Sequence, residues 1–455
     1  VYREANELSL LLETVSERSG LVDEQDDEER KTHLISLWWA AAAALALAAI
    51  VWARGLATSE PLAWVSSSHQ AELSGSALRG DSKFDRGLLR LYKGIAHIEM
   101  QNGVELILED QCELKLIDQN TVQLHHGKMR VHCPMEARGF EVLAPGDNRI
   151  VDLGTEFGVS AEPSGEVDLH VFDGFVELTA SDHPTQTIEA GQAVGIAPNK
   201  TVVESDADEA LFASIGSVRQ KRWAAHHRAM LQRSDLLLYY DFAEAGSRSA
   251  SVSEVNRASN DAHGTIHGAT RVAGRVPGKG GLLFEQPGDR LTFELDPSQP
   301  LKNFTIAMWL KVDRFEHRHS TLLNSDGWET GDIHFHILRD GNLRSDIRGR
   351  RAFQSGSGTV EPGRWQFIAV AWNLDTGNTR FFCDGESYYP RLRNPSGREI
   401  GEAQPSFGSC QIGAWGDPTI HHPTRDFKGR VDEVMIFSRS LEDSEIKALY
   451  EASKP

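Results

Sequence analysis

The residues of this chain best suited to metal chemistry are two pairs of histidines, each with one residue between its members. The pairs are His317 with His319 and His334 with His336. Alternate side chains of a β-strand point to the same face, so each pair would present two imidazoles together. A zinc site needs further ligands, and the spacing identifies no third one. Two interpretations stay open: a metal site, and the polar face of an exposed strand.

Carboxyl groups are the next candidates for chemistry, because glycoside hydrolysis requires two of them about 5 to 10 Å apart. After residue 236 the chain has no closely spaced ExDxxE pattern, and Asp432 and Glu433 are adjacent in the last predicted strand. We therefore expect a binding protein, not an enzyme, and no cofactor. Calcium is possible, although no dense group of Asp and Asn marks a loop for it.

Two tryptophans lie in sequence typical of loops, Trp328 in Gly-Trp-Glu and Trp415 in Ala-Trp-Gly-Asp. Gly and Asp favour turns, and a large apolar ring is costly to expose without a use. An indole plane can stack on a sugar ring. We predict a binding rim for a carbohydrate or cell-surface partner that includes Trp328 and Trp415. The alternative is that each ring packs back onto its own domain.

The four cysteines fall two in each half of the chain, Cys112 with Cys133 and Cys383 with Cys410. They form no CxxC pair and no Cys/His spacing of a zinc site. Each pair can form a disulfide only if its compartment is oxidising and its Cα atoms lie within about 7 Å. Buried free thiols are the alternative.

An apolar run at residues 34–53 has Ser36 as its only polar residue and carries no charge. At 1.5 Å per residue, a helix of this length crosses a hydrocarbon core of about 30 Å. Arg30 and Lys31 precede the run and only Arg54 follows it closely, so the positive-inside rule predicts a cytoplasmic N-terminus. We therefore expect a single pass through the inner membrane, with the later domains outside the cytoplasm.

The elements around this span are mainly strands. Residues 1–33 read as a short acidic and helical segment, and Val1 in place of Met indicates that upstream sequence is missing. Residues 60–203 alternate apolar and polar side chains between glycines, which predicts an all-β domain. Residues 206–234 lack this alternation and predict a helical connector, and the β pattern returns over 235–455. The predicted class is mainly β.

The segment GFEVLAPGDNRIVDLGTEFGV at 139–159, followed by VDLHVFDGFVEL from Val167, resembles the FecR domain of bacterial iron-signalling regulators. The planctomycete-type form is the most similar, and the resemblance covers about residues 60–200. It implies a membrane-anchored regulator whose cytoplasmic side contacts a sigma factor. Family members carry a larger helical cytoplasmic domain, whereas 33 residues precede the predicted span here.

Within this motif, the residues themselves favour a structural role. Gly154 and Gly158 indicate tight turning or close backbone approach. Asp152, Thr155 and Glu156 can satisfy buried amides beside these turns. We therefore expect turn residues without chemistry of their own.

The second β region resembles a laminin G-like, concanavalin A-like jelly roll over about residues 236–452. The segments that carry the resemblance are NFTIAMWLK at Asn303, GRWQFIAVAWN at Gly363, CQIGAWG at Cys410 and FKGRVDEVMIFSRSLEDSEIKALY at Phe427. It implies two sheets packed face to face. The residues expected on one inner face are Phe304, Ile306, Met308 and Leu310. It also places Cys383 and Cys410 on neighbouring late strands, which implies a bridge there in preference to Cys112 with Cys133.

The net charge and its distribution limit the classes of partner that this protein can bind. The net charge of -19 is spread along the chain without a basic block, which argues against nucleic-acid binding. The leading hypothesis is a membrane-anchored FecR-type regulator, with a sigma factor or membrane signalling partner inside and a carbohydrate or cell-surface protein outside. The alternative is a cell-surface glycan-binding or adhesion protein without a signalling role.

Overall fold

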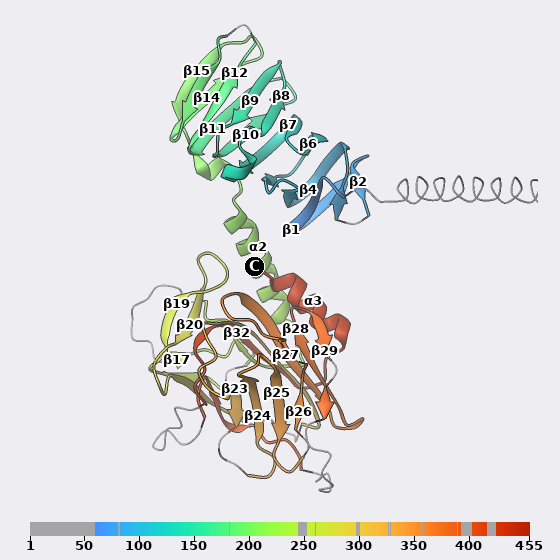
Figure 1. Ribbon diagram of the computed structural model, residues 1–455, viewed down its shortest axis with the longest axis vertical. Helices are drawn as coiled ribbons and strands as arrows, with labels where there is room; N and C mark the ends of the chain where they lie inside the picture. Colours follow the sequence, from blue (N-terminus) through green and yellow to red (C-terminus); the bar gives the residue numbers. More distant parts are fainter. Residues whose placement is uncertain are drawn as a thin grey trace, which may run out of the picture. The chain divides into compact units, whose positions relative to one another are not determined.

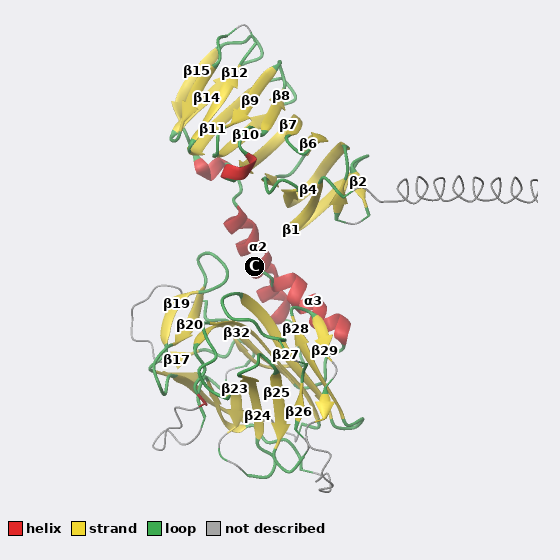
Figure 2. Ribbon diagram, in the orientation of Figure 1, coloured by secondary structure: helices red, strands yellow, loops and turns green. Residues whose placement is uncertain are grey.

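The computed structural model describes residues 60–455, apart from residues 81, 182, 244–252, 260, 297–300, 326, 328, 351, 357, 389, 393–402 and 416–424. Strands between residues 63 and 206 form one sheet, and strands from residue 236 onward form two more (Figure 1). Figure 2 shows that strands predominate over helices. The predicted mainly β class is therefore confirmed.

The first sheet is built from fifteen strands, and each pair of neighbours is antiparallel except β7 with β8. The strands are β1 (Ala63–Ser74), β2 (Leu78–Arg79), β3 (Lys83–Phe84), β4 (Gly87–Met100), β5 (Glu105–Leu108), β6 (Cys112–Asp118), β7 (Thr121–His132), β8 (Glu141–Ala144), β9 (Asn148–Asp152), β10 (Glu156–Ala161), β11 (Val167–Asp173), β12 (Phe175–Thr179), β13 (Gln186–Glu189), β14 (Gln192–Ile196) and β15 (Val202–Asp206). Two short 3-10 helices, η1 (Met135–Ala137) and η2 (Glu209–Leu211), follow β7 and β15. Apolar side chains from strands along its whole length form one core.

The DLGTEFG segment makes the turn between β9 and β10. The buried Asp152 carboxylate accepts hydrogen bonds from the backbone N–H of Gly154 at 2.8 Å and from the Thr155 hydroxyl. Gly154 has φ of +99°, a conformation that L side chains rarely adopt. A Cβ atom on Gly158 would lie 2.8 Å from the Phe212 ring. These contacts are structural, in agreement with the role expected for this motif from the sequence.

In the part of the chain that the structure describes, no helix is both long enough and apolar enough to cross a membrane. The predicted span at residues 34–53 and the preceding segment 1–33 lie outside the described residues.

The predicted connector contains helix α2 (Ile215–Met230). Its N-terminus is closed by a capping box, in which Ser214 and Ser217 each accept a hydrogen bond from the other's backbone N–H. The helix has almost no amphipathic pattern of its own. Its position therefore depends on specific contacts with the following domain, described below.

The C-terminal domain consists of two packed antiparallel sheets. The eight-stranded sheet contains β16 (Leu236–Tyr240), β19 (Thr270–Ala273), β20 (Gly280–Phe284), β22 (Asn303–Val312), β27 (Trp365–Asn373), β28 (Asn378–Cys383), β29 (Glu386–Tyr388) and β32 (Gly429–Phe437). The nine-stranded sheet contains β17 (Ser253–Glu254), β18 (Gly264–His267), β21 (Arg290–Leu295), β23 (His319–Ser325), β24 (Ile333–Leu338), β25 (Leu343–Ile347), β26 (Phe353–Gln354), β30 (Arg391–Leu392) and β31 (Gly408–Ile412). Helix α3 (Asp443–Ser453) ends the domain.

The predicted alternation on β22 is confirmed. Phe304, Ile306, Met308 and Leu310 belong to the core between the two sheets. The intervening residues face the other way, where Ala307 and Trp309 pack in a second apolar cluster with Ile446 and Leu449 of α3. The eight-stranded sheet is thus apolar on both faces, since α3 covers its outer one.

Candidate binding face

The outer face of the nine-stranded sheet, called here the polar face, differs from every other sheet face of this domain. On β21, β24 and β31 the inward side chains are apolar, among them Leu291, Phe335 and Ile412. The side chains that alternate with them are polar. The polar face is formed by Thr265, His267, Arg290, Thr292, Glu294, Thr321, Asn324, His334, His336, Arg344, Asp346, Ser409 and Gln411. A face of this composition can exchange hydrogen bonds with a hydroxyl-rich ligand.

Strand register aligns six of these side chains into one line across the sheet, called here the polar row. The row runs through directly paired residues on β18, β21, β31, β23, β24 and β25, namely Thr265, Thr292, Gln411, Asn324, His334 and Asp346. Thr265, at one end of the row, is exposed to solvent. Gln411, Asn324 and His334 are buried. Every member can donate or accept hydrogen bonds.

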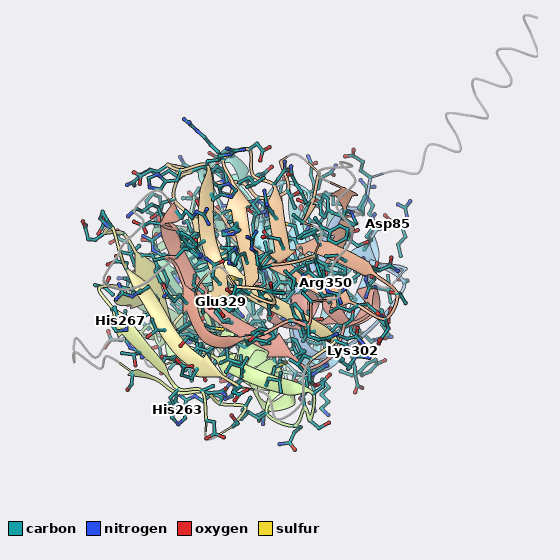
Figure 3. All side chains as sticks on the ribbon, turned by 90° about the horizontal axis from the view of Figure 1, so that it is seen from below. Asp85, His263, His267, Lys302, Glu329 and Arg350 are labelled. Atoms are coloured by element: carbon teal, nitrogen blue, oxygen red, sulfur yellow. The ribbon has the colours of Figure 1, made fainter. Side chains whose placement is uncertain are left out.

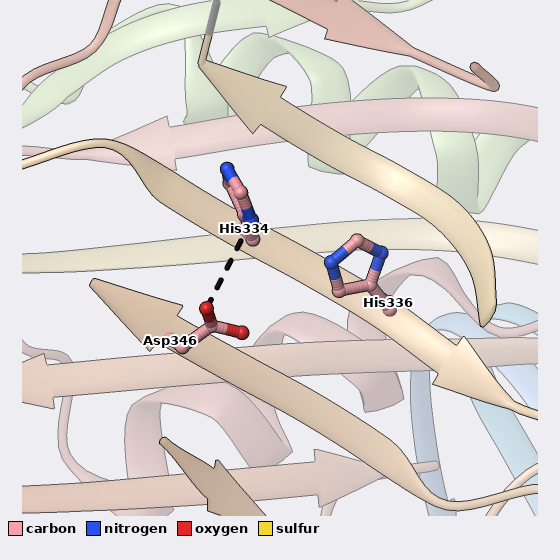
Figure 4. A group of neighbouring side chains, drawn as sticks. All are labelled: His334, His336 and Asp346. Carbon is pink, nitrogen blue, oxygen red and sulfur yellow. Dashed lines mark ion pairs between the residues drawn. The ribbon is translucent and has the colours of Figure 1, made fainter. Parts of the chain in front are cut away.

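Three residues near the end of the row form a compact group: His334, His336 and Asp346 (Figure 4). Their possible ligand atoms all lie within 4.8 Å of one another. Nδ1 of His334 is 3.9 Å from Oδ2 of Asp346. The predicted placement of His334 and His336 on one face of a strand is correct, because both belong to β24. Sequence reasoning missed the third member, Asp346, which comes from the next strand.

The second histidine pair does not form the same arrangement. His319 begins β23, whereas His317 lies before the strand, where its Nε2 is 3.9 Å from a carboxylate oxygen of Glu316. The His319 ring instead contacts His336 edge to face, with 5.4 Å between ring centroids. His319 therefore lies beside His336 on the polar face, whereas His317 does not belong to the strand.

Burial keeps these imidazoles neutral. Loss of solvent lowers the pKa of His319 to about 4 and holds the pKa of His334 and His336 below the ordinary value. The Arg344 and Arg425 guanidiniums act in the same direction. At neutral pH each ring therefore has one nitrogen that can donate a hydrogen bond and one that can accept.

Of the two predicted tryptophans, Trp415 lies beside the polar face. Its half-buried ring meets His334 edge to face at 6.2 Å, and the Arg425 guanidinium lies over it at 4.1 Å. The ring is outside the core between the sheets. A ligand would thus meet an indole that already has one face against a cation.

Trp328 lies outside the described residues. The residue after it, Glu329, donates its backbone N–H to the Asp332 carboxylate at 2.5 Å. The neighbouring loop is held by Arg350, whose guanidinium donates to the Ala403 carbonyl. Figure 3 labels Glu329 and Arg350 on this end of the domain. Loops next to the polar face are therefore anchored by specific hydrogen bonds.

The adjacent carboxylates Asp432 and Glu433 are fully buried in an ion network. Arg275 pairs with both, reaching Glu433 at 2.6 Å, and Lys279 pairs with Asp432. The register of β32 against β22 shifts between Val431 and Glu433, so Asp432 has no partner on β22. This bulge explains how two consecutive side chains reach the same guanidinium, that of Arg275.

Helix α2 is attached to the same network. The Trp223 indole N–H donates to Glu433 at 2.7 Å, and the Tyr239 hydroxyl donates to the same oxygen at 2.9 Å. His226 is also buried here, and loss of solvent lowers its pKa to about 4. The network fixes the helix on the domain and is a structural element.

The four cysteines are all buried free thiols. The predicted bridge between Cys383 and Cys410 is wrong, because both residues are free thiols; β28 and β31 belong to different sheets. Instead the Cys383 sulfur accepts a hydrogen bond from Gln366 at 3.1 Å, and the Cys410 thiol donates to the Phe407 carbonyl at 3.3 Å. Cys112 and Cys133 also remain unbridged. Burial raises the pKa of Cys112 and Cys383 to about 12, so these thiols stay protonated.

Comparison with known proteins agrees with the architecture of the C-terminal domain. Residues 287–447 match the family model of the concanavalin A-like lectin/glucanases superfamily. A search of the curated proteins found no match. Residues 287–447 thus belong to a concanavalin A-like jelly-roll domain.

Two solved structures illustrate the similarity. One is the ligand-binding domain of botulinum neurotoxin serotype D in complex with N-acetylneuraminic acid, with 14% identity and a TM-score of 0.37 over 50% of this chain and 52% of that one. The other is domain 4 of AbnA, a GH43 extracellular arabinanase from Geobacillus stearothermophilus, in complex with arabinotriose. It has 17% identity and a TM-score of 0.33 over 48% of this chain and 98% of that one. The chain spans about half the length of the neurotoxin domain.

Proposed function

We propose that the C-terminal domain binds carbohydrate on its polar face. The observation that carries this proposal is the polar row, in which six hydrogen-bonding side chains lie in register across six strands. Sugar hydroxyls both donate and accept, and they are matched by amide, imidazole, hydroxyl and carboxylate groups held on a rigid sheet. The family model, which includes lectins, supports the same ligand class.

Binding without hydrolysis is part of the proposal. On the described strands of the polar face the two carboxylates are Glu294 on β21 and Asp346 on β25. Three strands lie between β21 and β25, which separates these carboxylates by roughly 19 Å at about 4.8 Å per strand. A glycosidase needs about 5 to 10 Å. The pair on β32, Asp432 and Glu433, is already neutralised by buried cations.

Aromatic stacking completes the proposed site. Trp415 borders the row at His334, and its Arg425 neighbour adds a positive charge. Trp328, which lies outside the described residues, remains a predicted second aromatic contact. A glycan would contact the accessible members of the row, Thr265, Thr292 and Asp346, whereas Gln411, Asn324 and His334 are buried.

We further propose that this domain acts outside the membrane as part of a FecR-type regulator. The apolar run at 34–53 and the FecR-like motif at 139–159 support this context. In it, the cytoplasmic side binds an extracytoplasmic-function sigma factor. The alternative, an adhesin without a signalling role, keeps the same glycan site.

The glycan proposal is tested by applying a protein of residues 60–455 to a glycan array beside Trp415→Ala and Trp328→Ala variants. We expect selective retention by the parent protein and weaker retention by the variants. The proposed glycan site is excluded if the folded parent protein binds no glycan on the array. It is also excluded if both folded variants bind as the parent does.

The signalling proposal needs the full chain in its native membrane. Affinity purification followed by mass spectrometry should recover an extracytoplasmic-function sigma factor. Repeated recovery of glycan-binding activity without any sigma factor would favour the adhesin.

A further inference from the structure

His334, His336 and Asp346 on the polar face bring together two imidazoles and one carboxylate, ligands that bind transition metals. We propose that His334, His336 and Asp346 bind a divalent transition-metal ion of the zinc class. The proposal does not depend on glycan binding, because the protein supplies all three metal ligands itself.

The backbone geometry brings the three donors together without any further folding step. His334 and His336 are two residues apart on β24, and Asp346 on β25 is directly opposite His334. Their donor atoms lie within 4.8 Å of one another. Ligands of a tetrahedral zinc ion are about 3.4 Å apart, given bond lengths of about 2.0 to 2.1 Å. Side-chain rotation on two fixed strands can close this difference.

A second observation points to a ligand at this position. Nδ1 of His336 is buried and has no hydrogen-bond partner among the residues that the structure describes, and the residue is only 2% exposed. A buried polar atom left unsatisfied costs about 1 to 3 kcal/mol, so native proteins rarely keep one without a reason. A metal ion would satisfy the lone pair of a neutral imidazole.

Neighbouring charges decide which ions fit. Asp346 also pairs with Arg344, with 3.3 Å between the guanidinium Nε and a carboxylate oxygen, and Arg425 lies near the group. The positive charges of Arg344 and Arg425 weaken the binding of any ion that is held by electrostatic attraction alone. Two imidazole ligands bind zinc, cobalt or nickel through their lone pairs, whereas calcium and magnesium require oxygen ligands. The site should therefore discriminate against calcium.

The three residues leave coordination positions open. His319 is the nearest additional imidazole, and its Nδ1 is also buried without a hydrogen-bond partner in the described part of the chain. An open position would accept this ring, water or a ligand hydroxyl.

The test is a titration of the metal-free full chain with Zn²⁺ by calorimetry, and with Co²⁺ by visible absorption. We expect one saturable site, a cobalt spectrum typical of nitrogen and oxygen ligands, and no displacement by excess Ca²⁺. His336→Gln and Asp346→Asn should each weaken zinc binding by at least about tenfold. His267→Gln, on the same face but away from the group, should bind as the parent does.

The absence of saturable zinc binding would overturn the proposal. So would equal affinity in the parent and both ligand variants, because the ion would then occupy another site. Circular dichroism establishes that each variant is folded, and Asp346→Asn keeps the shape of its side chain. No glycan is present in the titration, so its outcome is separate from that of the array experiment.

Discussion

Nδ1 of His334 lies 3.9 Å from Oδ2 of Asp346, because β24 and β25 pair these two residues directly. The contact joins the histidine pair to a carboxylate twelve positions further along the chain. It also marks the point where the polar row meets the proposed metal site. A ligand hydroxyl bound at the end of the row would lie close to the metal.

The polar row predicts which hydroxyl groups contribute to glycan affinity. Replacing Thr265 with Val keeps the side-chain shape and removes one hydrogen-bonding group at the exposed end of the row. We expect glycan affinity, measured by calorimetry, to fall about fivefold, the equivalent of one hydrogen bond of about 1 kcal/mol. Thr270→Val, an exposed strand position on the other sheet, is the matched control. Equal losses in both variants would count against the row as the contact surface.

The buried ion network predicts a large stability effect. Glu433→Gln removes one of the two carboxylates that balance Arg275 and Lys279 in a fully buried site. Breaking such a pair costs about 3 to 5 kcal/mol, because the remaining charge is uncompensated. Glu361→Gln, whose ion pair with Arg364 is largely exposed, should cost less than about 1 kcal/mol. Urea denaturation of both variants gives the comparison, and similar costs would contradict a network role.

Protonation of buried histidines predicts how stability depends on pH. Burial lowers the pKa of His226 to about 4, against about 6.5 in the unfolded chain. Between these values the unfolded chain binds a proton that the folded chain does not, so stability falls as pH decreases. This residue alone contributes a loss of about 2 kcal/mol between pH 7 and pH 5.

Replacing His226 with Leu should therefore reduce the pH dependence of the free energy of unfolding over this range. The exposed His183→Leu is the control and should leave the slope unchanged. The comparison concerns the slope with pH, so it holds even if Leu changes the stability at pH 7. An unaltered slope in His226→Leu would show that other groups dominate.

The free thiols predict behaviour under oxidising and reducing conditions. Because all four cysteines are buried and unbridged, a reductant should leave the melting temperature unchanged. A thiol reagent should react slowly with the folded protein and label four groups after denaturation. Fewer than four labelled groups in fresh, unreduced protein would reveal a bridge.

The sequence by itself determined the elements whose signals are local. Alternating apolar residues predicted β22 and its inner face, because a strand has a side-chain period of two. The same rule placed His334 and His336 together.

Only the tertiary structure decided which strands became neighbours. Pairing of β24 with β25 brought Asp346 to the histidines, and pairing across six strands aligned the polar row. The bulge at Asp432 turned two consecutive carboxylates toward Arg275, and strand order placed Cys383 and Cys410 on different sheets. Pairing and register depend on contacts between residues far apart in the chain, which a local pattern does not encode.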